Sequence, residues 1–193
     1  MTRGVCIMRL SKVGYYSDFV LYPSALVALA GAVLWTPTIE RTSAWLAALL
    51  GATVTWTLVE YALHRFLFHG VAYISNMHDA HHSDQKALIG SPTWLSGLMI
   101  ASLGFLPWFL LFDFTIASGI ASGLILGYLW YVSVHHFIHH GRFGLGAFGY
   151  RLKRHHMLHH HFNEMGNFGV TSPLWDRVFG TEIDVRLVGV TAR

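Results

Sequence analysis

The sequence has few charged residues: Lys, Arg, Asp and Glu make up 12% of its 193 positions, about half the roughly 25% of typical soluble domains. Hydrophobic residues account for 53%, and the mean hydropathy is +0.45. This balance is typical of a polytopic membrane protein. The net charge is only +3, and the basic residues do not alternate with exposed aromatic residues, so we do not expect nucleic acid as a partner.

Several common metal sites are missing from the chain. A single cysteine, Cys6, excludes an internal disulfide and any zinc site built from several cysteines. The His-Glu-x-x-His sequence of zinc metalloproteases does not occur, nor does the Glu-x-x-His pattern of ferritin-like di-iron bundles. No triad of two histidines and one carboxylate is apparent. Any metal site in this chain would therefore consist mainly of imidazoles.

Histidine, by contrast, is abundant, with fourteen residues in four clusters. Neutral imidazole is the commonest metal ligand, and residues at i, i+3 and i+4 share one face of a helix. The alternatives are ordinary interfacial polar residues or a disordered metal-buffering tract. Clusters that are spread over distant, helix-forming segments favour an organised site for two metal ions. The clusters are His64 and His69; His78, His81 and His82; His135, His136, His139 and His140; and His155, His156, His159, His160 and His161.

Four apolar runs are each about long enough to cross a hydrocarbon core of roughly 30 Å. We expect Ser43 to cap the second helix and Pro107 to kink or break the third. The segments 64–93 and 135–193 are too polar to cross and are expected to form a helical cytoplasmic cap. The predicted fold is all-α, a single integral membrane domain over residues 1–193. The four runs cover residues 19–36, 44–63, 94–112 and 114–134.

The basic residues are unevenly distributed between these runs. Three Lys or Arg residues precede the first run, one lies between the first and second, two lie between the second and third, and seven follow the fourth. The positive-inside rule then places both termini in the cytoplasm. All histidine clusters fall on the same side, although no histidine entered the charge argument. The first 17 residues show no clear cleavage site, so we expect them to remain on the protein.

These motifs resemble those of the fatty acid hydroxylase and sterol desaturase superfamily of integral membrane di-iron oxygenases. The resemblance extends from His64 to Glu182 and includes the closing stretch 167–181. Within that stretch, the run Phe168–Ser172 looks most like that of the fatty acid 2-hydroxylases. The family's H-x4-H, H-x2-HH, H-x3-H and H-x2-HH motifs read here as His64/His69, His78/His81/His82, His135/His139 and His156/His159/His160.

The resemblance implies that these ten histidines hold two metal ions, with iron in the active enzyme. Zinc, which binds nitrogen ligands well, could replace iron in a purified sample. No side chain need act as a general base, no catalytic residue beyond the ligands is assigned, and Glu60, Asp79 and Asp176 are candidates for orienting the ligands. The pair His136/His140 is an alternative register for the third motif. Four histidines exceed the family pattern: His136, His140, His155 and His161.

The implied reaction is O₂-dependent hydroxylation of a lipid acyl chain, at carbon 2 of a fatty acid or a ceramide-type lipid. Sterol desaturation, carotenoid hydroxylation and non-catalytic metal binding are the alternatives. No cytochrome b5-like segment is recognisable, so we expect a separate cytochrome b5-like or ferredoxin-like electron donor. The basic residues Arg142, Arg151, Lys153 and Arg154 could dock such a donor or, equally, contact anionic lipid headgroups.

A substrate chain entering from the bilayer would need a path lined by apolar side chains. Five aromatic residues are candidates, and the alternative role for each is interfacial anchoring or helix packing. They are Trp56, Tyr61, Trp94, Trp130 and Tyr131.

Overall fold

The computed structural model describes residues 9–141 and 146–184. The chain divides into two compact units. We call Met1–Trp56 with Ala87–Trp130 the helical unit, and Thr57–Lys86 with Tyr131–Arg193 the histidine unit. Over the described ranges the regular elements are all helices, and the β-structure is one isolated bridge between Arg9 and Ile89. The all-α prediction is therefore confirmed.

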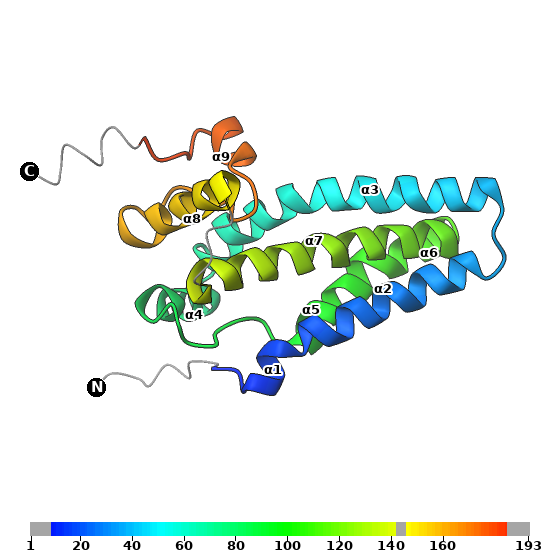
Figure 1. Ribbon diagram of the computed structural model, residues 1–193, viewed down its shortest axis with the longest axis horizontal. Helices are drawn as coiled ribbons and strands as arrows, with labels where there is room; N and C mark the ends of the chain where they lie inside the picture. The colour runs from blue at the N-terminus through cyan, green and yellow to red at the C-terminus, as the bar shows by residue number, and fades with distance from the viewer. Residues whose placement is uncertain (1–8, 142–145, 185–193) are drawn as a thin grey trace, which may run out of the picture. The chain divides into compact units, whose positions relative to one another are not determined.

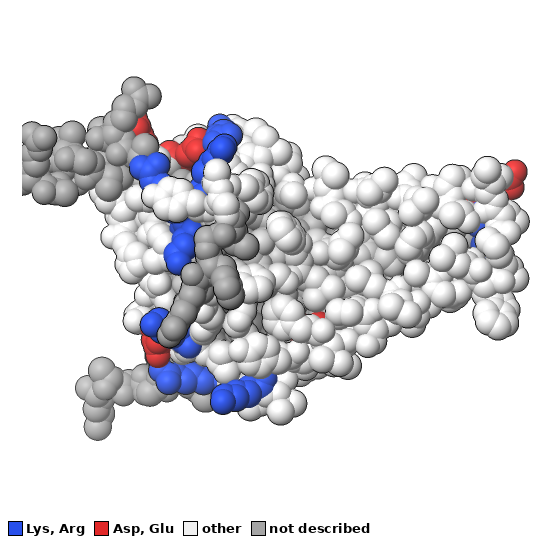
Figure 2. All heavy atoms as spheres, in the orientation of Figure 1, with Lys and Arg blue, Asp and Glu red and all other residues white. Residues whose placement is uncertain are grey.

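Four helical stretches among the described residues are long and apolar enough to cross a membrane, as predicted. Figure 2 shows that the visible face of the long helices carries almost no charged side chains. The first stretch comprises α1 (Lys12–Tyr16) and α2 (Asp18–Leu34), and the second comprises α3 (Ile39–Ala62) and the π-helix η1 (Leu63–Phe68) (Figure 1). The third comprises α5 (Thr93–Met99), the π-helix η2 (Ile100–Phe105) and α6 (Leu106–Leu111), and the fourth is α7 (Phe114–His140).

The second stretch begins earlier than predicted. The hydroxyl of Thr38 accepts a hydrogen bond from the Arg41 amide at 3.2 Å, which is the geometry of a helix N-cap. Ser43 lies inside α3, and its hydroxyl donates to the Glu40 carbonyl at 3.0 Å. The prediction that Ser43 caps this helix was therefore wrong, because α3 already begins at Ile39 and Thr38, five residues before Ser43, accepts from the Arg41 amide of its first turn.

The predicted interruption at Pro107 is present as a change of helix type. Proline has no amide hydrogen and clashes with the carbonyl four residues earlier in a regular α-helix. Here Pro107 lies in the first turn of α6, where it is tolerated, and the π-helical η2 precedes it. The third stretch thus keeps its length without a regular α-helix running through the proline.

A polar network is buried in the helical unit. The Asp18 carboxylate, with 6% of its surface exposed, accepts hydrogen bonds from the hydroxyls of Thr93 and Tyr128. The Tyr22 and Ser96 hydroxyls pair at 2.7 Å. These bonds join α2, α5 and α7. Sequence reasoning missed Asp18 because this residue comes immediately before the expected first span.

Small residues let α7 lie close to α3 within the helical unit. A Cβ atom on Gly123 would lie 2.3 Å from the Leu49 carbonyl oxygen, and one on Gly127 would lie 2.3 Å from Cγ of Trp56. Close approach through small residues four positions apart is a common way for helices to associate in membranes.

The histidine unit contains the end of α3, η1, the end of α7 and three further helices: α4 (Ala72–Ser83), α8 (Gly146–His161) and α9 (Leu174–Val178). Its apolar core includes Val134, Ile138, Leu152 and Val170. Two long helices extend into the segments that were expected to be polar, 64–93 and 135–193. The second helical stretch continues to Phe68, and α7 continues to His140. Two histidine clusters therefore lie on the ends of the long helices.

Candidate metal centre

Ten of the fourteen histidines form two groups in the histidine unit. Within each group, one ring nitrogen of every residue lies within 4.8 Å of those of all the others. The rings of His82 and His160, one from each group, stack with centroids 4.1 Å apart, so the groups are neighbours. The first histidine group is His64, His69, His78, His82 and His159, and the second histidine group is His81, His135, His139, His156 and His160.

Helical spacing explains how α4 serves both groups. Successive residues of an α-helix are about 100° apart, so His78 and His82 are separated by about 40° and join the first group together. His81 lies about 60° to the other side of His78 and joins the second group. A spacing of four keeps two imidazoles at one site, and a spacing of three sends the third to the neighbouring site.

Helix α8 repeats this arrangement with the two groups exchanged. His156 and His160, four residues apart, belong to the second group, and His159 belongs to the first. We expected these three side chains to share one face, and they do. The sequence did not reveal that this face is divided between two sites.

The π-helix η1 brings His64 and His69 together. Five residues on a regular α-helix correspond to about 500°, which would point the two rings about 140° apart. In η1 the His69 amide donates to the His64 carbonyl at 3.3 Å, the i→i+5 bond of a π-helix. The two rings stack with centroids 5.3 Å apart. The five-residue spacing was itself a signal for this π-turn, and sequence reasoning did not use it.

The third motif offered two registers, and the structure brings only one of them to the site. His135 and His139 belong to the second group, and Tyr131 stacks on His135 at 5.8 Å between centroids. His136 and His140 stack on each other instead, at 4.7 Å. They lie outside both groups, and so do the extra histidines His155 and His161.

The ring nitrogens converge as ligands of a common ion would. The Nε2 atom of His78 lies 3.0 Å from those of His64 and His82, and Nε2 of His156 lies 3.0 Å from those of His139 and His160. Two nitrogens bound at right angles to one ion, each about 2.1 Å from it, would be about 3.0 Å apart. The arrangement therefore fits a metal ion in each group.

Unpaired buried nitrogens support the same fit. Neither ring nitrogen of His81 has a hydrogen-bond partner among the described residues, although its side chain is buried. An unpartnered buried polar group is costly, and a metal ion bound to one of the nitrogens would supply the missing partner.

The pKa values of these histidines leave them ready to bind a cation. Burial, together with neighbouring imidazoles, lowers the pKa of His82 to about 3. Burial lowers the pKa of His81 and of His159 to about 4. At neutral pH these rings are uncharged, and each has one nitrogen with a free lone pair, which is the form that coordinates metals.

Two ligand candidates of the first group are oriented by backbone carbonyls. Nδ1 of His64 lies 2.5 Å from the Phe168 carbonyl oxygen, and Nδ1 of His159 lies 2.8 Å from that of Gly166. Since a carbonyl only accepts, each Nδ1 carries the hydrogen and each Nε2 is free to bind metal. Sequence reasoning missed these two contacts because every residue has a backbone carbonyl, so the residue types do not show which carbonyl accepts.

The three carboxylates predicted to orient ligands have different surroundings. Glu60 and Asp176 are buried, with 3% and 0% exposure, and both accept hydrogen bonds from the segment 168–171. Asp79 is exposed on α4. Among the aromatic candidates for a substrate path, Trp94 and Trp130 are exposed, while Trp56 and Tyr61 are buried.

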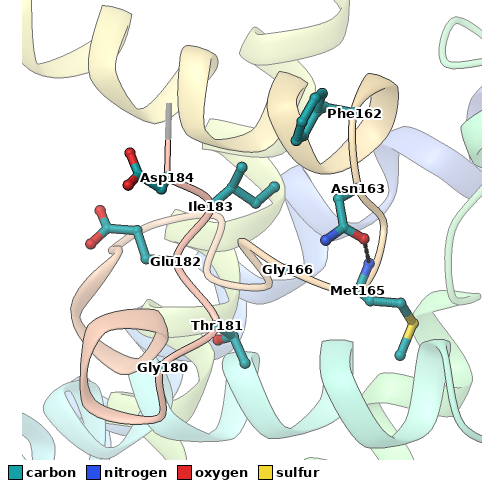
Figure 3. Close-up of a pocket in the computed structure, with 9 residues that line it drawn as sticks. All are labelled: Phe162, Asn163, Met165, Gly166, Gly180, Thr181, Glu182, Ile183 and Asp184. Atoms are coloured by element: carbon teal, nitrogen blue, oxygen red, sulfur yellow. Dashed lines mark hydrogen bonds between the residues drawn. The ribbon is translucent and has the colours of Figure 1, made fainter. Parts of the chain in front are cut away.

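A surface pocket of about 330 Å³ lies beside the closing stretch. Figure 3 shows the segment Gly180–Asp184 running next to the turn Asn163–Gly166. No histidine of either group lines this pocket.

The chain is similar to known lipid hydroxylases. Residues 49–181 match the model of the fatty acid hydroxylase family. The chain is 36% identical over 138 residues to a dihydroceramide fatty acyl 2-hydroxylase of Arabidopsis thaliana. This alignment covers 66% of this chain and 57% of that protein. It is 40% identical to a ceramide very long chain fatty acid hydroxylase of Saccharomyces cerevisiae, over 65% of this chain and 35% of the relative. The chain thus spans less than two thirds of these curated relatives.

The chain is also similar to a solved structure. Full-length scs7p, in which only the hydroxylase domain is visible, superposes with a TM-score of 0.75 and 30% sequence identity. The match covers 89% of this chain and 67% of that one.

Proposed function

The chain belongs to the fatty acid hydroxylase family, and from this membership we propose that it hydroxylates a lipid acyl chain at a centre of two metal ions held by ten histidines. The observation that carries the proposal is the division of these histidines into two groups of five whose ring nitrogens converge. Ordinary polar residues at a membrane interface would have no reason to converge twice.

Iron is the proposed metal of the active enzyme. Bound iron would supply O₂ activation and attack on an unactivated C–H bond, which zinc, having no redox chemistry, does not supply. The two buried carboxylates, Glu60 and Asp176, are already occupied by hydrogen bonds, and the Glu164 carboxylate, 4.0 Å from Nδ1 of His82, is largely exposed. The protein's own part is therefore to bind and orient the metals and to keep water away, and no side chain is assigned as a general base.

The proposed substrate is a fatty acid or a ceramide-type lipid, attacked at carbon 2. The relatives in Arabidopsis and yeast are named as ceramide or dihydroceramide hydroxylases, and the human relative, 31% identical, is named as a fatty acid 2-hydroxylase. The four apolar helical stretches support a substrate that reaches the site from a bilayer. The distribution of basic residues supports both termini and the histidine groups on the cytoplasmic side.

Electrons would come from a separate protein that docks on the outer face of α8. Arg151, Lys153 and Arg154 are exposed on this helix, while His156 and His159 on its inner face are buried. A helix is only about 10–12 Å across, so an acidic donor docked there would lie one helix away from the metal ligands. Arg142, the fourth predicted docking residue, lies outside the described residues.

Charge reversal at this face would test the donor. Replacing Arg151, Lys153 and Arg154 together with Glu should slow turnover with the protein donor several-fold and leave turnover with a small chemical reductant unchanged. Equal turnover of the variant and the parent with the protein donor would remove α8 as the docking face.

The test of the function itself is lipid mass spectrometry on cells that express the chain with a competent electron donor. We expect a lipid that gains one oxygen, with fragment ions placing the hydroxyl at carbon 2. A His81→Ala, His159→Ala variant, which removes one ligand from each group, should give none of this product. The matched control is His136→Ala, His161→Ala, which removes two histidines outside the groups and should keep it.

Other products would indicate a different substrate or a different function. A new double bond in a sterol, or a hydroxyl on a carotenoid ring, would replace the acyl chain as the substrate. An unchanged lipid profile from metal-loaded protein with a working donor would contradict the oxygenase proposal and favour metal handling.

A further inference from the structure

The segment Gly166–Thr171, which we call the clamp loop, is buried throughout and contacts the first histidine group through its backbone. The carbonyl oxygens of Phe168 and Gly166 accept from Nδ1 of His64 and His159. The positions of these two rings therefore depend on where the clamp loop lies. A loop has no hydrogen-bond ladder of its own to fix it, so something else must hold its backbone.

Asp176, at the start of α9, holds one half of the loop. Its Oδ1 accepts from the Phe168 amide at 2.8 Å and from the Thr181 hydroxyl at 2.8 Å. Its Oδ2 accepts from the Gly169 amide at 2.8 Å and from Nε2 of His155 at 3.0 Å. Four donors fill the acceptor sites of the carboxylate. Although burial by itself raises the pKa of Asp176, these hydrogen bonds, led by that from His155, hold it below its usual value.

Glu60, on α3, holds the other half. Its Oε1 accepts from the amides of Val170 and Thr171 at 2.7 and 2.8 Å, and its Oε2 accepts from the Thr171 hydroxyl at 2.6 Å. Four consecutive amides of the clamp loop, from Phe168 to Thr171, thus end on two carboxylates. The fit is close: a Cβ atom on Gly169 would lie 2.1 Å from the Ser172 carbonyl oxygen and 3.0 Å from Oδ2 of Asp176.

The second histidine group has no comparable support among the described residues. The Nδ1 atoms of His139, His156 and His160 are buried without a hydrogen-bond partner there. Outer hydrogen bonds fix the orientation of a ligating imidazole and make it a stronger ligand, and their loss typically weakens metal binding by about 10–100-fold. The two groups therefore differ in what holds their ligands.

We propose that Asp176 and Glu60 are positioning residues for the metal ion of the first histidine group. They fix the clamp loop, and its Phe168 and Gly166 carbonyls in turn fix His64 and His159 with Nε2 directed at the ion. Because this role presupposes the proposed metal centre, the measured quantity is metal binding at each group separately and not turnover.

Asp176→Asn is the sharpest variant. Each oxygen of Asp176 accepts from one backbone amide, so either orientation of an Asn side chain places its NH₂ group against an N–H donor of the clamp loop. Glu182→Gln is the matched control, since it also turns a carboxylate into an amide in the same segment. Its partner is Arg177 at the surface, 3.0 Å away, and it makes no contact with the clamp loop among the bonds described.

Each group is measured in a background that disables the other. His139→Ala with His160→Ala leaves the first group, and His69→Ala with His82→Ala leaves the second. Co²⁺ is titrated into the full-length purified chain in detergent, and the visible ligand-field spectrum reports both affinity and coordination. We expect Asp176→Asn to raise the Kd of the first group about 10–100-fold and to change its spectrum. The second group should change less than about 3-fold, and Glu182→Gln should change neither.

Several outcomes would overturn the proposal. A folded Asp176→Asn protein that binds Co²⁺ normally at the first group, or that weakens both groups equally, removes the positioning role. Where Asp176→Asn does not fold, Thr171→Val decides by the same criterion. It keeps the side-chain shape and removes only the hydroxyl bond to Glu60, so we expect a several-fold loss at the first group alone. Failure of the unsubstituted chain to bind Co²⁺ would instead contradict the proposed function.

Discussion

At the scale of single residues, adjacent histidines on α7 should behave differently. His135 belongs to the second histidine group, whereas His136 stacks on His140 outside both groups. We expect His135→Ala to lower the metal content of the purified protein from two ions towards one, because it removes one of five converging imidazoles. His136→Ala is the matched control and should retain both ions. Elemental analysis by mass spectrometry provides the measurement.

The opposite result would change the assignment of this motif. If His136→Ala lost a metal ion and His135→Ala did not, the register of the motif would be His136/His140. The proposed ligand set would then be wrong at two positions.

Single residues also show how far the sequence alone could go. The histidines that converge could be selected from their spacing and from the family motifs, because ligand chemistry is a property of residue type. The roles of Phe168 and Gly166 could not, because they act through backbone carbonyls that every residue possesses. Asp176 and Glu60 were intermediate cases: both could be named as candidates for orienting ligands, but their hydrogen-bond partners depend on how a loop folds.

At the scale of elements, the contact between α3 and α7 in the helical unit depends on glycine. A Cβ atom on Gly123 would lie 2.3 Å from the Leu49 carbonyl oxygen and 2.6 Å from Cβ of Ala52, so a larger side chain must push the helices apart. We expect Gly123→Leu to destabilise the protein by about 1–3 kcal/mol, the usual cost of overpacking, seen as a lower thermal unfolding temperature in detergent.

The control is Gly31→Leu on α2, where an added Cβ atom meets nothing within 4 Å. This variant should unfold near the temperature of the parent. Equal unfolding temperatures for Gly123→Leu and the parent would mean that α3 and α7 do not pack through Gly123.

Helix boundaries were predicted less well than the helices themselves, for identifiable physical reasons. The lengths of the apolar runs determined that four helical stretches exist. Their ends depended on local hydrogen bonds, such as that from the Arg41 amide to Thr38. The π-turn of η1 brings His64 and His69 together within the first histidine group, and helix propensities, which assume a regular α-helix, do not predict such a turn.

At the scale of the whole molecule, the distribution of basic residues predicts which side of the membrane each end of the helices faces. Three basic residues precede the first apolar run and seven follow the fourth, whereas one, Arg41, lies between the first and second. Because basic segments are retained in the cytoplasm, the turn before α3 should face the exterior, and the turn after α8 should face the cytoplasm.

Labelling of single cysteines with a membrane-impermeant maleimide measures this sidedness. Replacing the only cysteine by Cys6→Ser gives a clean background. Ile39→Cys and Met165→Cys then place one thiol at each end, at positions 86% and 66% exposed. We expect Ile39→Cys to be labelled in intact cells and Met165→Cys only after permeabilisation. The reverse labelling pattern would mean that the topology is inverted. The histidine groups and the docking face proposed for α8 would then lie outside the cell, where a cytoplasmic electron donor cannot reach them.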